Sequence, residues 1–140
     1  MLNSGNAIFI AASGAKNLAQ QIEAAMQQRT GVQSRVQVVP LDRLDTVIGE
    51  NALLDRMTDA ARMTVAFIGG STTARSVPLP DARSIAPDVL QAGRYAVYHW
   101  APNGQSGSRI PPAYWRAFGD AVTSRNWRTV LRLQEIAGRD

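Results

Sequence analysis

A glycine-rich segment holds the residues whose types and spacing come closest to a binding motif. Gly69-Gly70-Ser71-Thr72-Thr73 follows the apolar run Met63–Ile68, and backbone amides beside glycine, together with hydroxyl groups, can hold a phosphate. A phosphate-binding loop should open directly into a helix, but Pro78 and Pro80 follow and the segment has no Lys. We therefore interpret the segment as a turn and predict no cofactor. The candidate cofactor-binding residues are Gly69, Gly70, Ser71 and Thr72.

The only histidine, His99, is the next residue that could do chemistry. It stands between Tyr98 and Trp100 in an alternating apolar segment. An imidazole acts as a base beside a nucleophile, or as a metal ligand beside further ligands, and the sequence shows neither partner near it. We predict that His99 is a packed or interface histidine rather than a catalytic one.

The acidic residues are few and give no obvious catalytic or metal site. Asp55 and Asp59 lie four residues apart, where exposed ion pairs with Arg56 or Arg62 on a helix are the simpler interpretation. The chain has no Cys and only three Glu, whereas enzyme chemistry at neutral pH usually needs a titrating base, a thiolate or a metal cluster. We predict no catalytic residue, no metal site and a non-enzymatic protein.

Net charge and hydropathy limit the partners. The formal net charge is +4, and 14 of the 15 basic residues are Arg. They are scattered along the chain except for Arg125, Arg128 and Arg132, whereas nucleic-acid binders usually cluster their basic residues, so nucleic acid is not an expected partner. No apolar run is long enough to span a membrane and no signal peptide is recognisable. We expect a cytoplasmic or virion protein that does not bind membranes.

The first half of the chain predicts two helices and one strand ahead of the glycine-rich segment. Residues 7–12 suit a buried strand or the approach to a helix. Apolar residues at helical spacing between residues 18 and 28 predict a helix that ends at Gly31. Val36, Val38 and Val39 predict a strand that Pro40 ends, and residues 50–61 predict a second short helix.

The second half begins with the clearest strand, Met63–Ile68, in which Phe67 and Ile68 should be core residues. Residues 91–100 predict another strand, and Pro111-Pro112 predicts the start of a helix with Trp115, Phe118 and Val122 on its apolar stripe. Residues 127–136 suit a helix or a strand equally well. The loops at residues 72–87 and 103–108 should be exposed.

These elements predict a single domain spanning residues 1–140 with an α+β fold, in which one sheet of about four strands packs against two or three helices. An α/β flavodoxin-like arrangement is the alternative.

All the tyrosines and tryptophans lie in the last third of the chain. Core packing is the first explanation, but Tyr, Trp and Arg are also enriched at protein interfaces. The candidate interface residues are Tyr95, Tyr98, Trp100, Arg109 and Trp115.

The first half of the chain resembles TIR-like, flavodoxin-like nucleotide-binding domains. The resemblance rests on Ala7-Ile8-Phe9-Ile10-Ala11-Ala12-Ser13-Gly14, Val36-Gln37-Val38-Val39 and Val65-Ala66-Phe67-Ile68, and covers residues 7–70. It implies a small nucleotide- or ligand-binding domain. The NAD-cleaving Glu of that family lies on a later helix, and no Glu stands between Glu50 and Glu135, so the resemblance implies binding without NAD cleavage.

The order of elements also resembles phage tail terminator proteins. A helix at residues 18–28, strands at 63–71 and 90–100, and a helix with Tyr114-Trp115-Arg116 follow the layout of that family over residues 15–135. The resemblance implies a ring-forming structural subunit of a virion that contacts copies of itself and other structural proteins. A non-enzymatic assembly protein is therefore our first prediction, and the nucleotide- or ligand-binding domain is the alternative.

Overall fold

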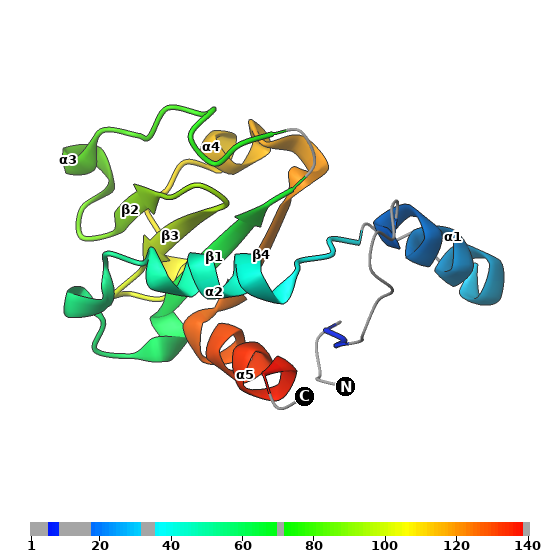
Figure 1. Cartoon of the computed structure of the whole chain (residues 1–140). Coiled ribbons are helices and arrows are strands. Elements are labelled where there is room, and N and C mark those ends of the chain that lie inside the picture. Colours follow the sequence, from blue (N-terminus) through cyan, green and yellow to red (C-terminus); the bar gives the residue numbers. More distant parts are fainter. Residues whose placement is uncertain (1–5, 9–17, 32–35, 70–71, 139–140) are drawn as a thin grey trace.

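The computed structural model describes residues 6–8, 18–31, 36–69 and 72–138, and one antiparallel sheet forms their centre (Figure 1). The strands are β1 Met63–Ile68, β2 Val89–Ala92, β3 Ala96–Trp100 and β4 Val122–Asn126. They stand in the order β2-β3-β1-β4, and every neighbouring pair is antiparallel. The α+β prediction is therefore confirmed, and the flavodoxin-like alternative, which needs a parallel sheet, is wrong for these strands.

Helices lie on both faces of the sheet. Their bounds are α1 Leu18–Thr30, α2 Leu41–Gly49, α3 Ala82–Ile85, α4 Pro112–Arg116 and α5 Trp127–Ala137. Helix α1 lies to one side of the sheet (Figure 1) and contributes no buried residue. Within the described part of the chain, no helix is long and apolar enough to cross a membrane.

One face of the sheet, here called the first face, packs against α2 and α5. Alternate residues of β1 and β3 point toward it, because side chains along a strand alternate between faces. The buried cluster on this face consists of Leu44, Val47, Leu53, Met63, Val65, Phe67, Ala96, Tyr98, Trp100, Trp127 and Val130. Phe67 is 7% exposed and Ile68 6%, so their prediction as core residues is confirmed.

The opposite, second face carries the other alternate residues and a smaller core. Ala66, Ile68 and Val97 pack there beneath α3 and α4, together with Ala74, Ile85, Ile110, Tyr114 and Phe118. Toward the Thr64 end of β1 the apolar side chains give way to a row of polar ones. This end of the second face positions the candidate site.

The helix at residues 18–28 and the helix start at Pro111-Pro112 are confirmed by α1 and α4. Residues 127–136, which suited either structure, belong to α5, because the Asn126 side chain accepts a hydrogen bond from the Thr129 amide and caps that helix. Two further predictions fall on residues outside those described: the strand or helix approach at residues 7–12, of which 9–12 are outside, and the candidate binding residues Gly70 and Ser71.

Five predicted elements need correction. The loop at residues 72–87, predicted to be exposed, contains helix α3 and the buried residues Ala74 and Ile85. Val36, Val38 and Val39 form no strand; they lead to Pro40, and α2 begins directly after it. Residues 50–61 form no continuous helix but two short 3₁₀ turns, Leu54–Arg56 and Ala60–Arg62. Side-chain oxygens of Asn51 and Asp59 accept from backbone amides two residues ahead, which favours turns over a helix.

The predicted strand at residues 91–100 is two strands of a hairpin. Gly93 occupies the turn, where an added Cβ would lie 3.0 Å from the Tyr98 ring, so a larger residue would require the buried ring to shift. Helix α4 ends at Arg116, and Val122 belongs to β4, a strand that the sequence did not predict.

Candidate ligand-binding site

A row of polar side chains crosses the second face of the sheet. His99 on β3 and Asn126 on β4 both pair with Thr64 of β1, which lies between them. Paired residues of antiparallel strands project from the same face, so the three side chains form one line. Gln105, in the loop that follows β3, donates a hydrogen bond from Nε2 to Thr64 Oγ1 at 3.0 Å.

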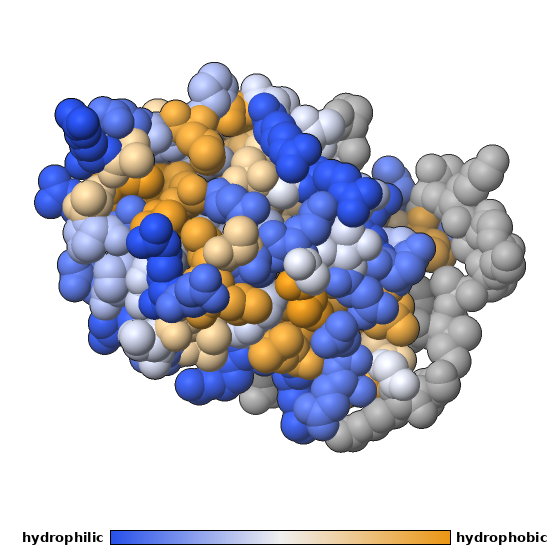
Figure 2. All heavy atoms as spheres, turned by 60° about the vertical axis from the view of Figure 1, so that its left-hand side comes forward, coloured by the Kyte–Doolittle hydropathy of each residue, from blue (hydrophilic) through white to orange (hydrophobic). Residues whose placement is uncertain are grey.

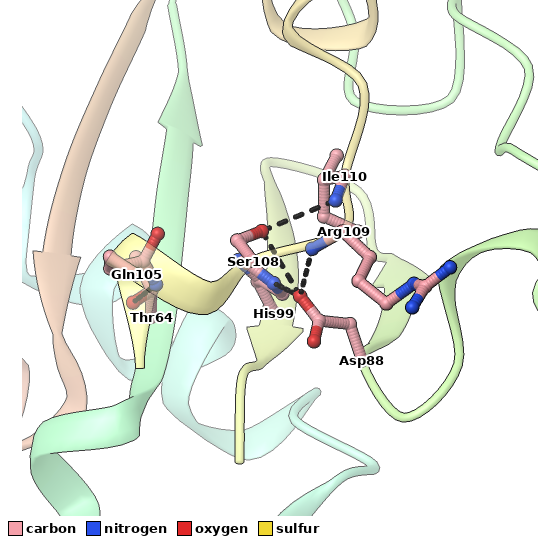
Figure 3. Close-up of polar contacts among 7 residues, drawn as sticks. All are labelled: Thr64, Asp88, His99, Gln105, Ser108, Arg109 and Ile110. Atoms are coloured by element: carbon pink, nitrogen blue, oxygen red, sulfur yellow. Dashed lines mark hydrogen bonds and ion pairs between the residues drawn. The ribbon is translucent and has the colours of Figure 1, made fainter. Parts of the chain in front are cut away.

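Asp88 holds one end of this row in place. His99 Nε2 lies 2.8 Å from Asp88 Oδ2, and both side chains are at most 1% exposed. The Ser108 hydroxyl and the Arg109 amide donate to the same oxygen at 3.0 and 3.3 Å (Figure 3). The carboxylate thereby ties the loop before α4 to the sheet.

The donors around Asp88 determine which nitrogen of His99 carries the proton. The Ser108 oxygen accepts from the Ile110 amide, so its own proton points to Asp88, and a backbone amide such as that of Arg109 can only donate. Because both groups already donate to Oδ2, this oxygen acts as an acceptor, and Nε2 of His99 carries a proton and donates to it as well. In neutral His99 the lone pair is then on Nδ1, which has no hydrogen-bond partner among the described residues.

A hollow of about 450 Å³ lies over the polar row. Its described lining residues are Ala61, Thr64, His99, Gln105, Trp115, Val122, Ser124, Arg125 and Asn126. The Trp115 ring is one wall, 6.1 Å from the His99 ring between centroids. Trp115 is itself held by an edge-to-face contact with Tyr114, whose ring centroid is 4.9 Å away.

Arg125 is the cation among the described residues that line this hollow, and it lines the hollow from the edge of the sheet, since its register partner Val65 belongs to the first face. Its Nε donates to Asn6 Oδ1 and its Nη1 donates to the Ser124 carbonyl, both at 2.7 Å. Both acceptors are neutral, and no ion pair joins Arg125 to an acidic side chain of the described residues. The guanidinium is therefore oriented while its charge is not neutralised.

Gly69, Thr72 and Thr73, the described residues of the glycine-rich segment, are not among the residues that line this hollow. The Gly69 amide donates to the Ala121 carbonyl at 2.7 Å, so it is not free to hold an anion. A Cβ on Gly69 would lie 3.0 Å from the Gln37 side chain. Close packing against Gln37 is therefore a sufficient explanation for a glycine at this position. Thr72 is followed by turns rather than by a helix, and Gly70 and Ser71 lie outside the described residues.

The candidate interface residues divide into two groups. Tyr98 is fully buried and Trp100 is 7% exposed, both in the core of the first face, so these two are corrected to core residues that no partner can reach. Tyr95 and Trp115 are half-buried and Arg109 is exposed, which leaves them accessible.

Other long-range contacts brace the opposite end of the sheet. Arg94 in the β2–β3 turn forms an ion pair with Glu50 at 2.7 Å, and its hydrogen bond lowers the pKa of the Glu50 carboxyl. Arg43 of α2 lies over the Tyr95 ring, 4.6 Å from its centroid. These contacts give Tyr95 a place in the fold that requires no partner protein.

The prediction that His99 is packed is confirmed by its burial, but its partner Asp88 was missed. The hairpin register explains the pairing: Leu90 faces His99, and Asp88, two residues earlier, is a diagonal neighbour on the same face. A hairpin at residues 89–100 would have revealed it. Ser124 and Asn126 were missed because their strand β4 was not predicted.

A comparison with protein families matches residues 1–98 to the family described as "Protein of unknown function (DUF1697)". The chain belongs to this family. The DUF1697 match includes Thr64 and Asp88 and ends one residue before His99. A search of curated proteins and a search of solved structures each found no match.

Proposed function

We propose that this DUF1697 domain binds a small polar ligand in the hollow over the polar row. One observation carries the proposal: hydrogen-bonding groups without partners converge beneath an aromatic wall at the open end of the second face. The hydroxyls of Thr64 and Ser124 and the Nδ2 amide of Asn126 donate no hydrogen bond to a described residue, and Nδ1 of His99 accepts none.

The composition of the hollow supports a binding role. Ligand sites typically combine apolar walls with a few placed polar groups in a cavity of about 300–1,000 Å³. Here Trp115, Val122 and Ala61 supply apolar surface, and the sheet holds the polar groups at fixed spacing. Side chains on paired strands are better positioned for recognition than side chains on free loops.

A thermal-shift screen of small polar metabolites tests the proposal. A ligand that binds only the folded state raises the melting temperature. Ala61→Trp should fill the hollow, because Ala61 lines it and is exposed. Ala82→Trp, on the exposed start of α3, is the matched control. We expect compounds that stabilise the wild type and Ala82→Trp but not Ala61→Trp. Equal stabilisation of both variants, or none of the wild type, would contradict the proposal.

The ring-forming assembly role and the virion location expected from the sequence stay predictions. Figure 2 shows groups of apolar side chains between hydrophilic ones on one face of the molecule. Exposed large hydrophobic residues include Leu54 and Leu79, and these exposed residues do not by themselves identify an interface. Size-exclusion chromatography with light scattering tests this prediction, since a closed ring has a multiple of the 15.2 kDa chain mass.

A further inference from the structure

We propose that the ligand of this hollow carries a carboxylate or phosphate group beside a flat ring. The inference rests on the proposed binding function and adds the chemical class of the ligand. It starts from the charge of the lining: Arg125 is a cation, and no acidic side chain is among the described lining residues.

The position of Arg125 makes its charge available. Two hydrogen bonds to neutral oxygens fix the guanidinium through Nε and Nη1, and Nη2 has no partner among the described residues. A guanidinium held in this way needs little reordering to bind an anion, and hydrogen bonds between charged groups are stronger than those between neutral ones.

The neighbouring groups extend the same donor character. Asn126 uses Oδ1 to cap α5, so its Nδ2 keeps two free N–H donors. The Thr64 hydroxyl accepts from Gln105, so its own proton is free to donate. Ser124 adds an exposed hydroxyl beside Arg125. Gln105 Oε1 and His99 Nδ1 are the acceptors of the set.

The nearest buried carboxylate does not reverse this preference. Asp88 lies behind His99 with its side chain fully buried, and three donors surround its Oδ2 atom. Its Oδ1 atom is buried without a partner among the described residues, and Asp88 is not among the residues that line the hollow. An anionic group bound near Arg125 and Asn126 therefore meets the donors of β4 and not the Asp88 oxygen.

Trp115 indicates the shape of the rest of the ligand. Its ring is half-buried, lines the hollow and is held in a tilted arrangement with His99 and an edge-to-face arrangement with Tyr114. Flat ligand rings stack on such fixed aromatic surfaces. A ring stacked on Trp115 with an anionic substituent directed toward β4 would use both features at once.

Calorimetric titration with matched probes tests the inference. The probes are adenosine against adenosine monophosphate, and benzamide against benzoate, with ribose 5-phosphate as the anion without a flat ring. We expect each anionic ring to bind at least about tenfold more tightly than its neutral counterpart, the usual scale of a charged hydrogen bond, and more tightly than ribose 5-phosphate.

Two variants locate the effect. Arg125→Gln should weaken the anionic rings by about tenfold or more and leave the neutral rings unchanged. Arg132→Gln removes the same charge from an exposed position that does not line the hollow and should change neither. Circular dichroism checks that both variants are folded.

The outcomes separate the inference from the function on which it rests. The inference is overturned if neutral and anionic rings bind equally, if both variants weaken binding equally, or if no anionic probe binds the wild type. The binding function survives any of these results if the thermal-shift screen finds a ligand that Ala61→Trp excludes. The binding function fails together with the inference if the thermal-shift screen also finds no stabilising compound.

Discussion

The two faces of the sheet are built from the same strands but are completed differently. On the first face, α2 and α5 cover Met63, Val65 and Phe67 of β1 with a large apolar cluster. On the second face, apolar packing covers Ala66 and Ile68 but not Thr64. The difference separates a surface that only holds the fold together from a surface that leaves polar groups available.

This comparison assigns different roles to similar residue types. Trp100 and Trp127 are buried on the first face, whereas Trp115 on the second is half-buried and lines a hollow. Fully enclosed aromatic residues contribute to stability through packing. An aromatic residue beside unpartnered donors contributes to recognition instead.

The largest expected effect on stability comes from the first face. Phe67→Ala should lower the free energy of unfolding by about 3–5 kcal/mol, because it removes a buried aromatic side chain and leaves a cavity. Thr64→Ala, from the same strand but the open end of the second face, should lower it by less than about 1 kcal/mol. Urea unfolding of both variants measures the difference, and equal losses would show that the faces do not differ as described.

The buried acid on the second face should have the next largest effect. Asp88→Ala leaves the His99 ring, the Ser108 hydroxyl and the Arg109 amide without their acceptor, which should cost at least about 2 kcal/mol. Asp88→Asn keeps one acceptor oxygen and should lose less. The same urea experiment checks both, and a stable Asp88→Ala variant would show that the network is not needed for the fold.

Alkaline pH should weaken the fold through two buried phenols. Burial raises the pKa of Tyr114 from 10.0 to about 12 and raises the pKa of Tyr98 further. Above about pH 10, the tyrosines of the unfolded state lose their protons while Tyr98 and Tyr114 of the folded state keep theirs. The free energy of unfolding therefore falls as pH rises above about 10. Unfolding measured at about pH 9 and about pH 11.5 should show this loss, and the double variant Tyr98→Phe/Tyr114→Phe should show a smaller one. An equal loss in the double variant would assign the effect to other groups.

The smallest effects distinguish the two tyrosines at neutral pH. Tyr98 donates to the Val47 carbonyl at 2.6 Å, whereas the Tyr114 hydroxyl is buried without a partner among the described residues. Tyr98→Phe should therefore cost about 1 kcal/mol, and Tyr114→Phe should be neutral or slightly stabilising. Thermal unfolding of the two variants checks the order, and a larger loss for Tyr114→Phe would contradict it.

Local patterns predicted the helices and the central strand, but tertiary pairing determined the site. The apolar run at Met63–Ile68 and the helical spacing before Gly31 depend on neighbours in sequence, so they could be recognised directly. The contact of Asp88 with His99 depends on hairpin register, and the line from His99 through Thr64 to Asn126 depends on β4. Residues 122–126 contain mostly polar side chains on an outer strand and give little periodic signal.

The most direct test of a binding site on the second face follows the three tryptophan indole N–H signals by nuclear magnetic resonance. The compound that gives the largest rise in melting temperature is titrated into ¹⁵N-labelled protein, with Trp115→Phe used to assign one signal. We predict that the Trp115 signal shifts progressively to saturation while those of Trp100 and Trp127 stay in place. A fixed Trp115 signal at saturation, with shifts at Trp100 or Trp127, would contradict the assignment of binding to the second face.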